Sequence, residues 1–262
     1  MTLSLNSLRK ELATIYSSYD NELQHWIDSY ERGVSCYKGC RTCCNMSVGL
    51  SLPEAFVLAD SLSDAEYERV AEYARQVYYY AGVTTDYLAD FRTAGPGWCP
   101  FLDEESGACS IHERRPANCH HVYSNLPPKY CDKDMERLLE HDAEKRQEFL
   151  SQLDPDINEY DLPIIAPLEK IFSEKYQYYL IILAARYFNV IVQGEMSWLI
   201  LLAREYDLWN MVTGADKQLS DFYEQLQVTG LYHENLLTGC EEVLPDIKEQ
   251  SACIDFANIV SL

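Results

Sequence analysis

The stretch Cys36-Tyr37-Lys38-Gly39-Cys40-Arg41-Thr42-Cys43-Cys44 places four cysteines within nine residues. A second group follows between residues 98 and 119 and contains Cys99, Cys109 and Cys119. Thiols this close together are reactive, and proteins make them unreactive by forming disulfides or by binding a soft metal. Which of these two chemistries applies decides what the protein is.

The N-terminal sequence favours the metal. Residues 1–10 have no basic segment ahead of an apolar one and no small-residue cleavage site, so we expect no secretory signal. In a reducing compartment, clustered cysteines indicate a metal or catalytic site more often than a disulfide scaffold. A chain of 262 residues can also bury an adequate core without disulfides. We therefore predict metal binding in a cytoplasmic protein, with disulfides and free structural thiols as the alternatives.

The formal net charge of −21 limits the partners. Phosphate backbones and anionic membrane surfaces would be repelled, so we expect neither nucleic acid nor a membrane as a partner. The two most apolar stretches, residues 178–187 and 196–203, are interrupted by Arg186 and ended by Arg204. Neither reaches the ~20 uninterrupted apolar residues of a membrane span. An acidic surface would suit a basic protein or peptide substrate.

The first 84 residues predict helices around the first cysteine group. Apolar side chains recur every three or four residues through the first thirty, which predicts one amphipathic helix that ends at Gly33. Two Ser-x-x-Glu capping boxes begin at Ser51 and Ser63. They predict helices of about 10 and about 18 residues, the second ending near Gly82. A shorter helix is expected over residues 85–91.

This helical insertion is expected to fold back so that the two cysteine groups meet. The turn-rich residues 103–107 predict a β-hairpin around them. Cys99 and Cys109 would then lie on adjacent strands and could point at one ion. Pro116 begins a short turn that carries Cys119 back towards that ion.

After residue 131 the sequence predicts helices almost to its end. The expected spans are residues 132–153, 167–190, 196–212 and 215–227, and the tail from Cys240 has no clear period. We therefore predict a mostly α fold, a helical domain with a small β-hairpin at a cysteine-rich metal centre. Residues 1–131 would form the cysteine-cluster region with its helical insertion. Residues 132–262 would form a helical region that packs on the first as one domain.

The cysteine spacing bears on the kind of metal centre. Cys40-x2-Cys43 lets two sulfurs hold one ion, as in zinc ribbons and iron–sulfur proteins, and Cys36 adds a third donor. Adjacent side chains tend to diverge, so we expect Cys43 and Cys44 to serve two metals or one polynuclear cluster. Seven thiolates exceed the four that one zinc ion needs. The excess favours a cluster, a binuclear site, or one structural site beside a working thiol.

The motifs also resemble those of a known family. In order they are Cys-x3-Cys-x2-Cys-Cys, Cys-Pro-Phe-Leu at residues 99–102, Cys-x-Ile at 109–111, Glu-x-Arg-Pro at 113–116, and a last cysteine at 119. Residues 36–121 thereby resemble the YkgJ-type cysteine-cluster family, which is described as a zinc- or iron-chelating domain and is related to the flagellin lysine N-methylases.

The resemblance implies a set of site residues. The implied metal ligands are Cys36, Cys40, Cys43, Cys44, Cys99, Cys109 and Cys119. It implies an iron–sulfur cluster (4Fe-4S) first and zinc second. Arg115 of the Arg-Pro turn would bind this cofactor, because its guanidinium could stabilise the negative charge of several thiolates.

Two histidines depart from the family pattern. His112 stands where the family often has Tyr, and His120 stands where it often has Arg; His121 follows directly. The three imidazoles could complete a coordination sphere or act as acid and base, and the alternative is that they are hydrogen-bonded surface groups. Cys131 is a candidate eighth ligand. The last two cysteines have no partner spacing and are expected to be small buried hydrophobic residues: Cys240 and Cys253.

Three functions are compatible with these residues. The first is a cytoplasmic protein that binds an iron–sulfur cluster or zinc. The alternative, implied by the resemblance, is a metal-dependent enzyme that modifies a basic protein or peptide, such as a lysine N-methylase-like protein that uses S-adenosylmethionine. A third is a carrier of metal or electrons through exposed thiols. The spacing of Cys36, Cys40 and Cys43 also matches radical S-adenosylmethionine enzymes, but the sequence predicts too few strands for their barrel.

Overall fold

The computed structural model describes residues 4–31, 33–84, 95–120, 122–124, 128–131, 142–152, 175–213 and 218–256. The helix predicted for residues 85–91 lies outside these ranges, as do His121 and all of residues 132–174 except 142–152.

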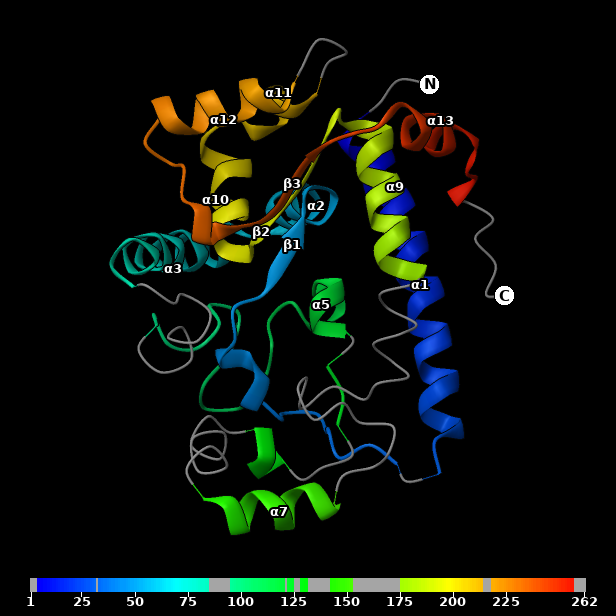
Figure 1. Ribbon diagram of the computed structural model, residues 1–262, viewed down its shortest axis with the longest axis vertical. Helices are drawn as coiled ribbons and strands as arrows, with labels where there is room; N and C mark the ends of the chain where they lie inside the picture. The colour runs from blue at the N-terminus through cyan, green and yellow to red at the C-terminus, as the bar shows by residue number, and fades with distance from the viewer. Residues whose placement is uncertain are drawn as a thin grey trace.

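The described part of the chain is mostly helical, as predicted (Figure 1). Its α-helices are α1 (Leu5–Ser29), α2 (Leu52–Ser61), α3 (Asp64–Val83), α5 (Ala117–His120), α7 (Ala143–Gln152), α9 (Gln177–Tyr187), α10 (Met196–Glu205), α11 (Leu208–Val212), α12 (Leu219–Val228) and α13 (Pro245–Cys253). Short 3-10 turns are η1 (Thr42–Asn45), η2 (His112–Arg114), η3 (Pro128–Cys131) and η5 (Glu234–Leu236). Strands β1 (Gly49–Ser51), β2 (Val190–Glu195) and β3 (Leu237–Glu242) form an antiparallel sheet in the order β1-β2-β3. No described helix is long and apolar enough to cross a membrane.

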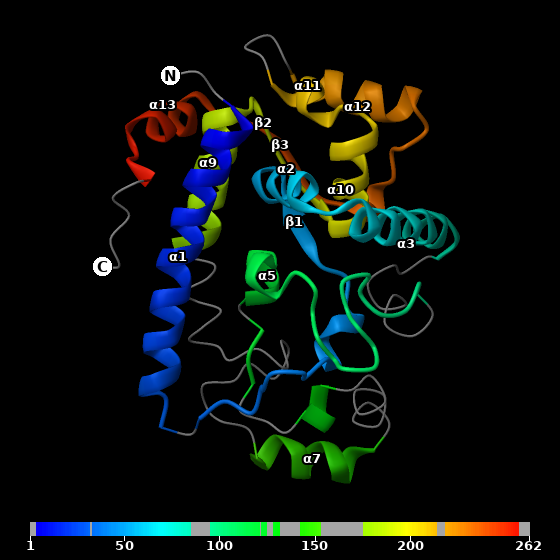
Figure 2. The ribbon, with the colours of Figure 1, turned by 180° about the vertical axis from the view of Figure 1, so that it is seen from behind.

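Helix α1 forms where the apolar period predicted it. Ser4 caps its first turn by accepting a hydrogen bond from Ser7 N at 3.2 Å. The buried stripe consists of Leu8, Leu12, Ile15, Tyr19 and Leu23. In both ribbon views α1 runs along one side of the molecule, from the end that holds the sheet to the end that holds the cysteine loops (Figures 1 and 2). Its last turn therefore delivers the chain to the first cysteine group.

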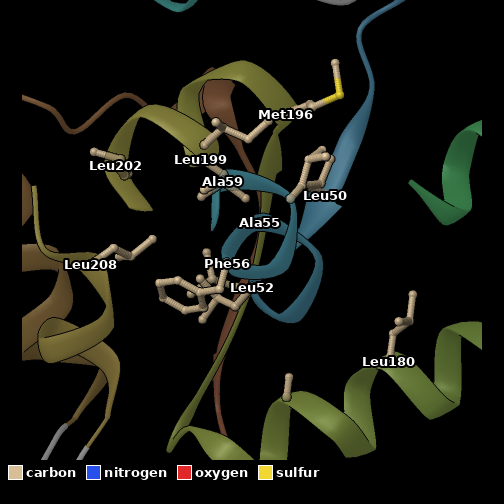
Figure 3. Packing of buried hydrophobic residues seen from close by; sticks show 14 of the residues in the cluster. Leu50, Leu52, Ala55, Phe56, Ala59, Leu180, Met196, Leu199, Leu202 and Leu208 are labelled. Carbon is tan, nitrogen blue, oxygen red and sulfur yellow. The ribbon is translucent and has the colours of Figure 1, made fainter. Parts of the chain in front are cut away.

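Helix α2 lies at the centre of the apolar core. Its side chains face β1 on one side and α10 and α11 on others (Figure 3). The packed residues include Leu50, Leu52, Ala55, Phe56, Ala59, Leu180, Met196, Leu199, Leu202 and Leu208. A short helix that is apolar around most of its circumference is stable only when other elements surround it. Both predicted capping boxes, Ser51 with Glu54 and Ser63 with Glu66, are present.

The sheet is the part of the fold that the sequence did not predict. Residues Val190 to Glu195 lie between two apolar helices, and such short apolar runs do not distinguish a strand from a buried helix. β3 is largely polar and is a strand because its backbone pairs with β2. Gly194 sits at the register shift between these strands, where a Cβ atom would lie 2.6 Å from Leu236 O. Only glycine fits this approach.

The predicted hairpin is present in its shortest form. One antiparallel bridge joins Leu102 to Cys109. Asp103 Oδ1 closes the turn by accepting from Glu105 N at 3.0 Å and from Ser106 N at 2.8 Å. The acidic side chains of this turn are exposed, as expected. The bridge therefore fixes the distance between Cys109 and the segment that follows Cys99.

The C-terminal helices differ from the predicted spans in one respect. The single helix expected over residues 196–212 is broken between α10 and α11, because Asp207 adopts a left-handed backbone conformation at φ 51°. Asn210 Nδ2 donates to its carboxylate at 2.7 Å and stabilises the break. The tail also holds α13, which begins at Pro245. One apolar cluster contains residues from Leu8 to Phe256, and the division of the chain at residue 131 stays a prediction.

A buried carboxylate connects three of the helices. Glu54 is 4% exposed, and its Oε1 accepts from Tyr16 Oη of α1 at 2.7 Å and from Ala117 N of α5 at 2.8 Å. Its Oε2 accepts from Ser51 N at 2.9 Å and from Ser51 Oγ at 2.6 Å. The same residue thus caps α2 and holds α5, which carries Cys119, against α1.

Replacing this carboxylate should destabilise the fold. Glu54→Ala leaves Ser51 N, Ala117 N and Tyr16 Oη without their acceptor, and each buried unpaired group costs about 1–3 kcal/mol. We expect the free energy of unfolding in urea to fall by about 3 kcal/mol or more. The matched control is Glu66→Ala, which removes the same capping position from the more exposed start of α3 and should cost about 1 kcal/mol. Equal losses would contradict the connecting role of Glu54.

Candidate metal centre

The first cysteine group is shaped by two tight turns. Gly39 adopts φ +92°, which only glycine readily supplies, and it turns the chain directly before Cys40. Cys44 N then donates to Arg41 O at 2.8 Å and closes the turn η1, which holds Cys43 and Cys44. The thiols of these adjacent residues hydrogen-bond to each other. The expectation that they diverge is therefore wrong: the 3-10 turn brings them together.

The two cysteine groups are joined through the backbone. Cys99 N donates to Cys44 O at 2.8 Å. Arg41 hydrogen-bonds through its guanidinium to Glu104 O and lies over the Trp98 ring, with Cζ 5.3 Å from the ring centroid. The predicted folding back of the helical insertion is thus present.

Two glycines also pack against each other between the groups. A Cβ atom on Gly107 would lie 2.5 Å from Gly39 O, so the turn before Cys109 packs backbone against backbone on the turn before Cys40. Gly107 also has a left-handed φ of +71°. Any larger residue at this position would push the two turns apart. In the sequence, Ser106-Gly107 predicts the turn of the hairpin, but nothing there predicts that this turn contacts Gly39.

Helix α5 positions Cys119 through bonds to several elements. Asn118 Nδ2 donates to Gly49 O of β1 at 2.7 Å, and Ala117 N donates to Glu54 of α2. His120 is hydrogen-bonded to Asp20 of α1, with 2.8 Å between Nδ1 and Oδ1. A four-residue helix cannot hold its own geometry, so these tertiary bonds fix where the Cys119 thiol points.

The seven predicted ligand thiols form one connected group. The thiol of Cys43 interacts electrostatically with those of Cys36, Cys44, Cys99, Cys109 and Cys119. Cys40 joins through Cys36. All seven are half-buried. The structure therefore brings the two sequence groups together around Cys43.

Burial and crowding oppose ionisation of these thiols. Burial raises the pKa of the Cys99 thiol to about 12, and it also raises the pKa values of Cys36, Cys109 and Cys119. The hydrogen bond with Cys43 is the largest cause of the raised pKa of Cys44. A bound metal cation reverses this balance, because a coordinating thiol is deprotonated outright.

Backbone amides are nevertheless directed at three of the sulfurs. Phe101 N–H donates to the sulfur of Cys99, and Ile111 N–H donates to that of Cys109. Each donor lies two residues after its cysteine. Ser124 N donates to Cys36 Sγ at 3.4 Å. Hydrogen bonds to sulfur stabilise thiolates and tune iron–sulfur clusters, so these donors suit metal-bound sulfurs.

Arg115 places positive charge beside three of these thiols. Its guanidinium interacts with the thiols of Cys36, Cys109 and Cys119 and opposes the rise in pKa that burial causes. Among the described residues no carboxylate forms an ion pair with it, and its buried Nε has no hydrogen-bond partner there. The charge of this half-buried arginine would be balanced if the thiols beside it were thiolates.

The C-terminal part of the chain reaches the same group. Glu195, at the end of β2, is 3% exposed and accepts from Ser197 Oγ at 2.6 Å and from Trp198 N at 2.9 Å. Burial raises its pKa, and its charge is one of the causes of the raised pKa of Cys99. No pattern in the sequence indicated this residue, because its position depends on the unpredicted pairing of β2 with β1.

The remaining candidates differ in their placement. His112 is exposed, with its Nδ1 3.4 Å from Glu113 Oε1, as the surface alternative expected. Cys131 ends η3, which packs against the turn η1 that carries Cys43 and Cys44. Cys240 is half-buried in β3 and hydrogen-bonded to Tyr223. The expectation of a buried Cys253 is wrong: this residue is exposed at the end of α13.

The donor set fits a soft metal. Within the ranges that the structure describes, no three His, Cys, Asp or Glu side chains meet at the spacing of ligands around a single ion. The chemistry of the site is nevertheless that of a thiolate centre: seven neighbouring thiols, backbone N–H donors at three sulfurs, and an arginine whose charge the thiols would balance. Zinc and iron–sulfur clusters both take such ligands.

The contact between Gly39 and Gly107 can be tested with a matched pair of substitutions. Gly107→Ala and Gly33→Ala both place alanine at a left-handed φ, +71° and +67°, so both should lose about 1–2 kcal/mol from backbone strain. Gly33 has no heavy atom within 4 Å of the added Cβ, whereas Gly107 has Gly39 O. We expect Gly107→Ala to lose more unfolding free energy and to retain less metal than Gly33→Ala. Equal behaviour of the two variants would show that the contact is unimportant.

Arg115 and its neighbour Arg114 provide a second pair. Arg115→Gln removes the positive charge beside the thiols, and we expect metal retention against a chelator to fall about 10-fold, as for other groups that support metal ligands. Arg114 is already bonded to Ser61 O at 2.6 Å and to Glu66 Oε1 at 3.0 Å. Arg114→Gln should therefore change stability more than metal retention. The reverse order would contradict the role given to Arg115.

Comparison with known proteins supports the same region. A family model described as "CxxCxxCC: Putative zinc- or iron-chelating domain" matches residues 35–148. No curated protein and no solved structure matches the chain. The matched residues include all seven predicted ligands and Arg115. Residues 35–148 are therefore similar to this cysteine-cluster family, as the motifs predicted.

Proposed function

We propose that the seven cysteines hold an iron–sulfur cluster of the 4Fe-4S type, with zinc as the alternative metal. The observation that carries this proposal is the position of Cys43, whose thiol neighbours five of the other six. Thiols arranged around one member can serve one compact centre, whereas two separate sites would divide them into two sets.

The number and chemistry of the donors support a polynuclear centre over one zinc ion. One structural zinc takes four ligands, and the chain offers seven neighbouring thiols. The thiol of Cys44 interacts with those of Cys43, Cys99 and Cys119. Backbone N–H donors at Cys36, Cys99 and Cys109 match the hydrogen bonds that stabilise cluster sulfurs.

The residues around the thiols have supporting tasks in this proposal. Arg115 would offset the negative charge of the thiolates, and the half-buried position of the cysteines would limit access of water. Glu54 and the glycine contact between residues 39 and 107 would hold the ligands in place. A bound cluster supplies one-electron chemistry. The lysine N-methylase relation, S-adenosylmethionine, a basic peptide substrate and a cytoplasmic location stay predictions.

Substituting the central thiol tests the proposal. Anaerobically purified protein should contain iron and acid-labile sulfide in near-equal amounts and should be brown, and Cys43→Ser should lose both. The control is Cys240→Ser, which removes a half-buried thiol hydrogen-bonded to Tyr223 and should leave the metal content unchanged. Metal retained in full by Cys43→Ser would overturn the proposal.

The same analysis separates the two metals. Colourless protein with stoichiometric zinc and no sulfide would show that the bound metal is zinc and not an iron–sulfur cluster. In that case the site is structural, and removing the metal with a chelator should lower the unfolding free energy, because metal-binding energy is folding energy in such sites.

A further inference from the structure

His120 is a buried histidine with one ring nitrogen paired and the other unpaired. It is 5% exposed and lies in the short helix α5, directly after Cys119. Its ring is flanked by two tyrosines of α1, with centroids 5.4 Å from Tyr16 and 5.9 Å from Tyr19. Its Nδ1 lies 2.8 Å from Asp20 Oδ1. Its Nε2 is buried and has no hydrogen-bond partner among the residues that the structure describes.

The hydrogen bond to Asp20 determines which nitrogen carries the proton. An ionised carboxylate only accepts hydrogen bonds, so Nδ1–H donates to Asp20. In the neutral imidazole the lone pair is then on Nε2. Asp20 is half-exposed, and Nε2 lies across the ring from it, so the lone pair points away from Asp20 into the protein. A buried nitrogen with a free lone pair is destabilising unless something binds it.

This arrangement has a familiar use in metal sites. A histidine that binds a metal almost always donates its other ring N–H to a carboxylate or a carbonyl, which fixes the tautomer and the ring orientation. Asp20 and His120 have this arrangement, with the metal-binding nitrogen left free. Cys119, the preceding residue, has a thiol whose electrostatic neighbours are Cys43, Cys99 and Cys109. Tyr16 lies beside both residues, because the Cys119 thiol also acts on its hydroxyl.

The charge of the centre agrees with a nitrogen ligand. A neutral imidazole adds a donor without adding negative charge, and Arg115 is one of the cations that act on Cys36, Cys109 and Cys119. His112 does not offer a buried nitrogen of this kind, because it is exposed and lies against Glu113.

We propose that His120 is a nitrogen ligand of the cysteine centre through Nε2, and that Asp20 is the positioning residue that holds its ring. This inference rests on the proposed metal centre and adds a ligand to it. It also connects the centre to α1, since Asp20 lies in the third quarter of that helix.

The direct test is the coordination sphere of the wild-type protein. X-ray absorption at the edge of the bound metal, after anaerobic loading with iron and sulfide or with zinc, should show imidazole scattering beside sulfur. The same signal should be lost in His120→Gln and kept in His112→Gln. An all-sulfur sphere in the metal-loaded wild type, or an imidazole signal that persists in His120→Gln, would overturn the proposal.

Metal retention gives a second readout that does not depend on one variant folding. We expect Asp20→Asn to weaken retention against EDTA about 10-fold, in line with carboxylates that orient metal-binding histidines. His120→Cys should restore a donor and retain more metal than His120→Gln. Equal retention by His120→Gln, Asp20→Asn and His112→Gln, with wild-type metal content intact, would overturn this inference and leave the proposed function standing. A wild-type protein that binds no metal would overturn both.

Discussion

The crowding of seven half-buried thiols around Cys43 is the constraint on which the rest of the structure depends. Burial raises the pKa values of Cys36, Cys99, Cys109 and Cys119, so a protein without a cation at this position holds acids that resist ionisation. A soft metal turns the same crowding into a stabilising interaction, because each thiol becomes a charged ligand. The amide donors at Cys99 and Cys109, and the positive charge of Arg115, all favour that state.

Two buried carboxylates connect this centre to the helical core. Glu54 holds α5 against α1 and α2, and α5 carries Cys119. Glu195 caps α10 at the end of β2 and lies close enough to Cys99 to raise its pKa. Glu54 and Glu195 therefore each join the cysteine loops to a helix or strand of the core. The position of the cysteine loops therefore depends on the packing of α2 and β2.

Much of the local structure followed from the sequence. The apolar period predicted α1, and the two Ser-x-x-Glu boxes predicted α2 and α3, because these signals depend on residues within one or two turns. The strand β2 was not predicted, because a short run of three apolar residues next to an apolar helix is compatible with either structure. The helix break at Asp207 was also missed, since a single left-handed residue leaves no periodic signal.

The sequence by itself determined which thiols are candidate ligands. Cysteine spacing singled out the seven thiols and predicted the family model that matches residues 35–148, since thiolates at such intervals have few stable uses. Only the tertiary structure decided how the thiols are arranged. Cys43 became their centre because Gly39 and Gly107 let two turns touch, and His120 acquired a partner because α5 meets Asp20 of α1. These contacts join residues far apart in the chain, so no local pattern contains them.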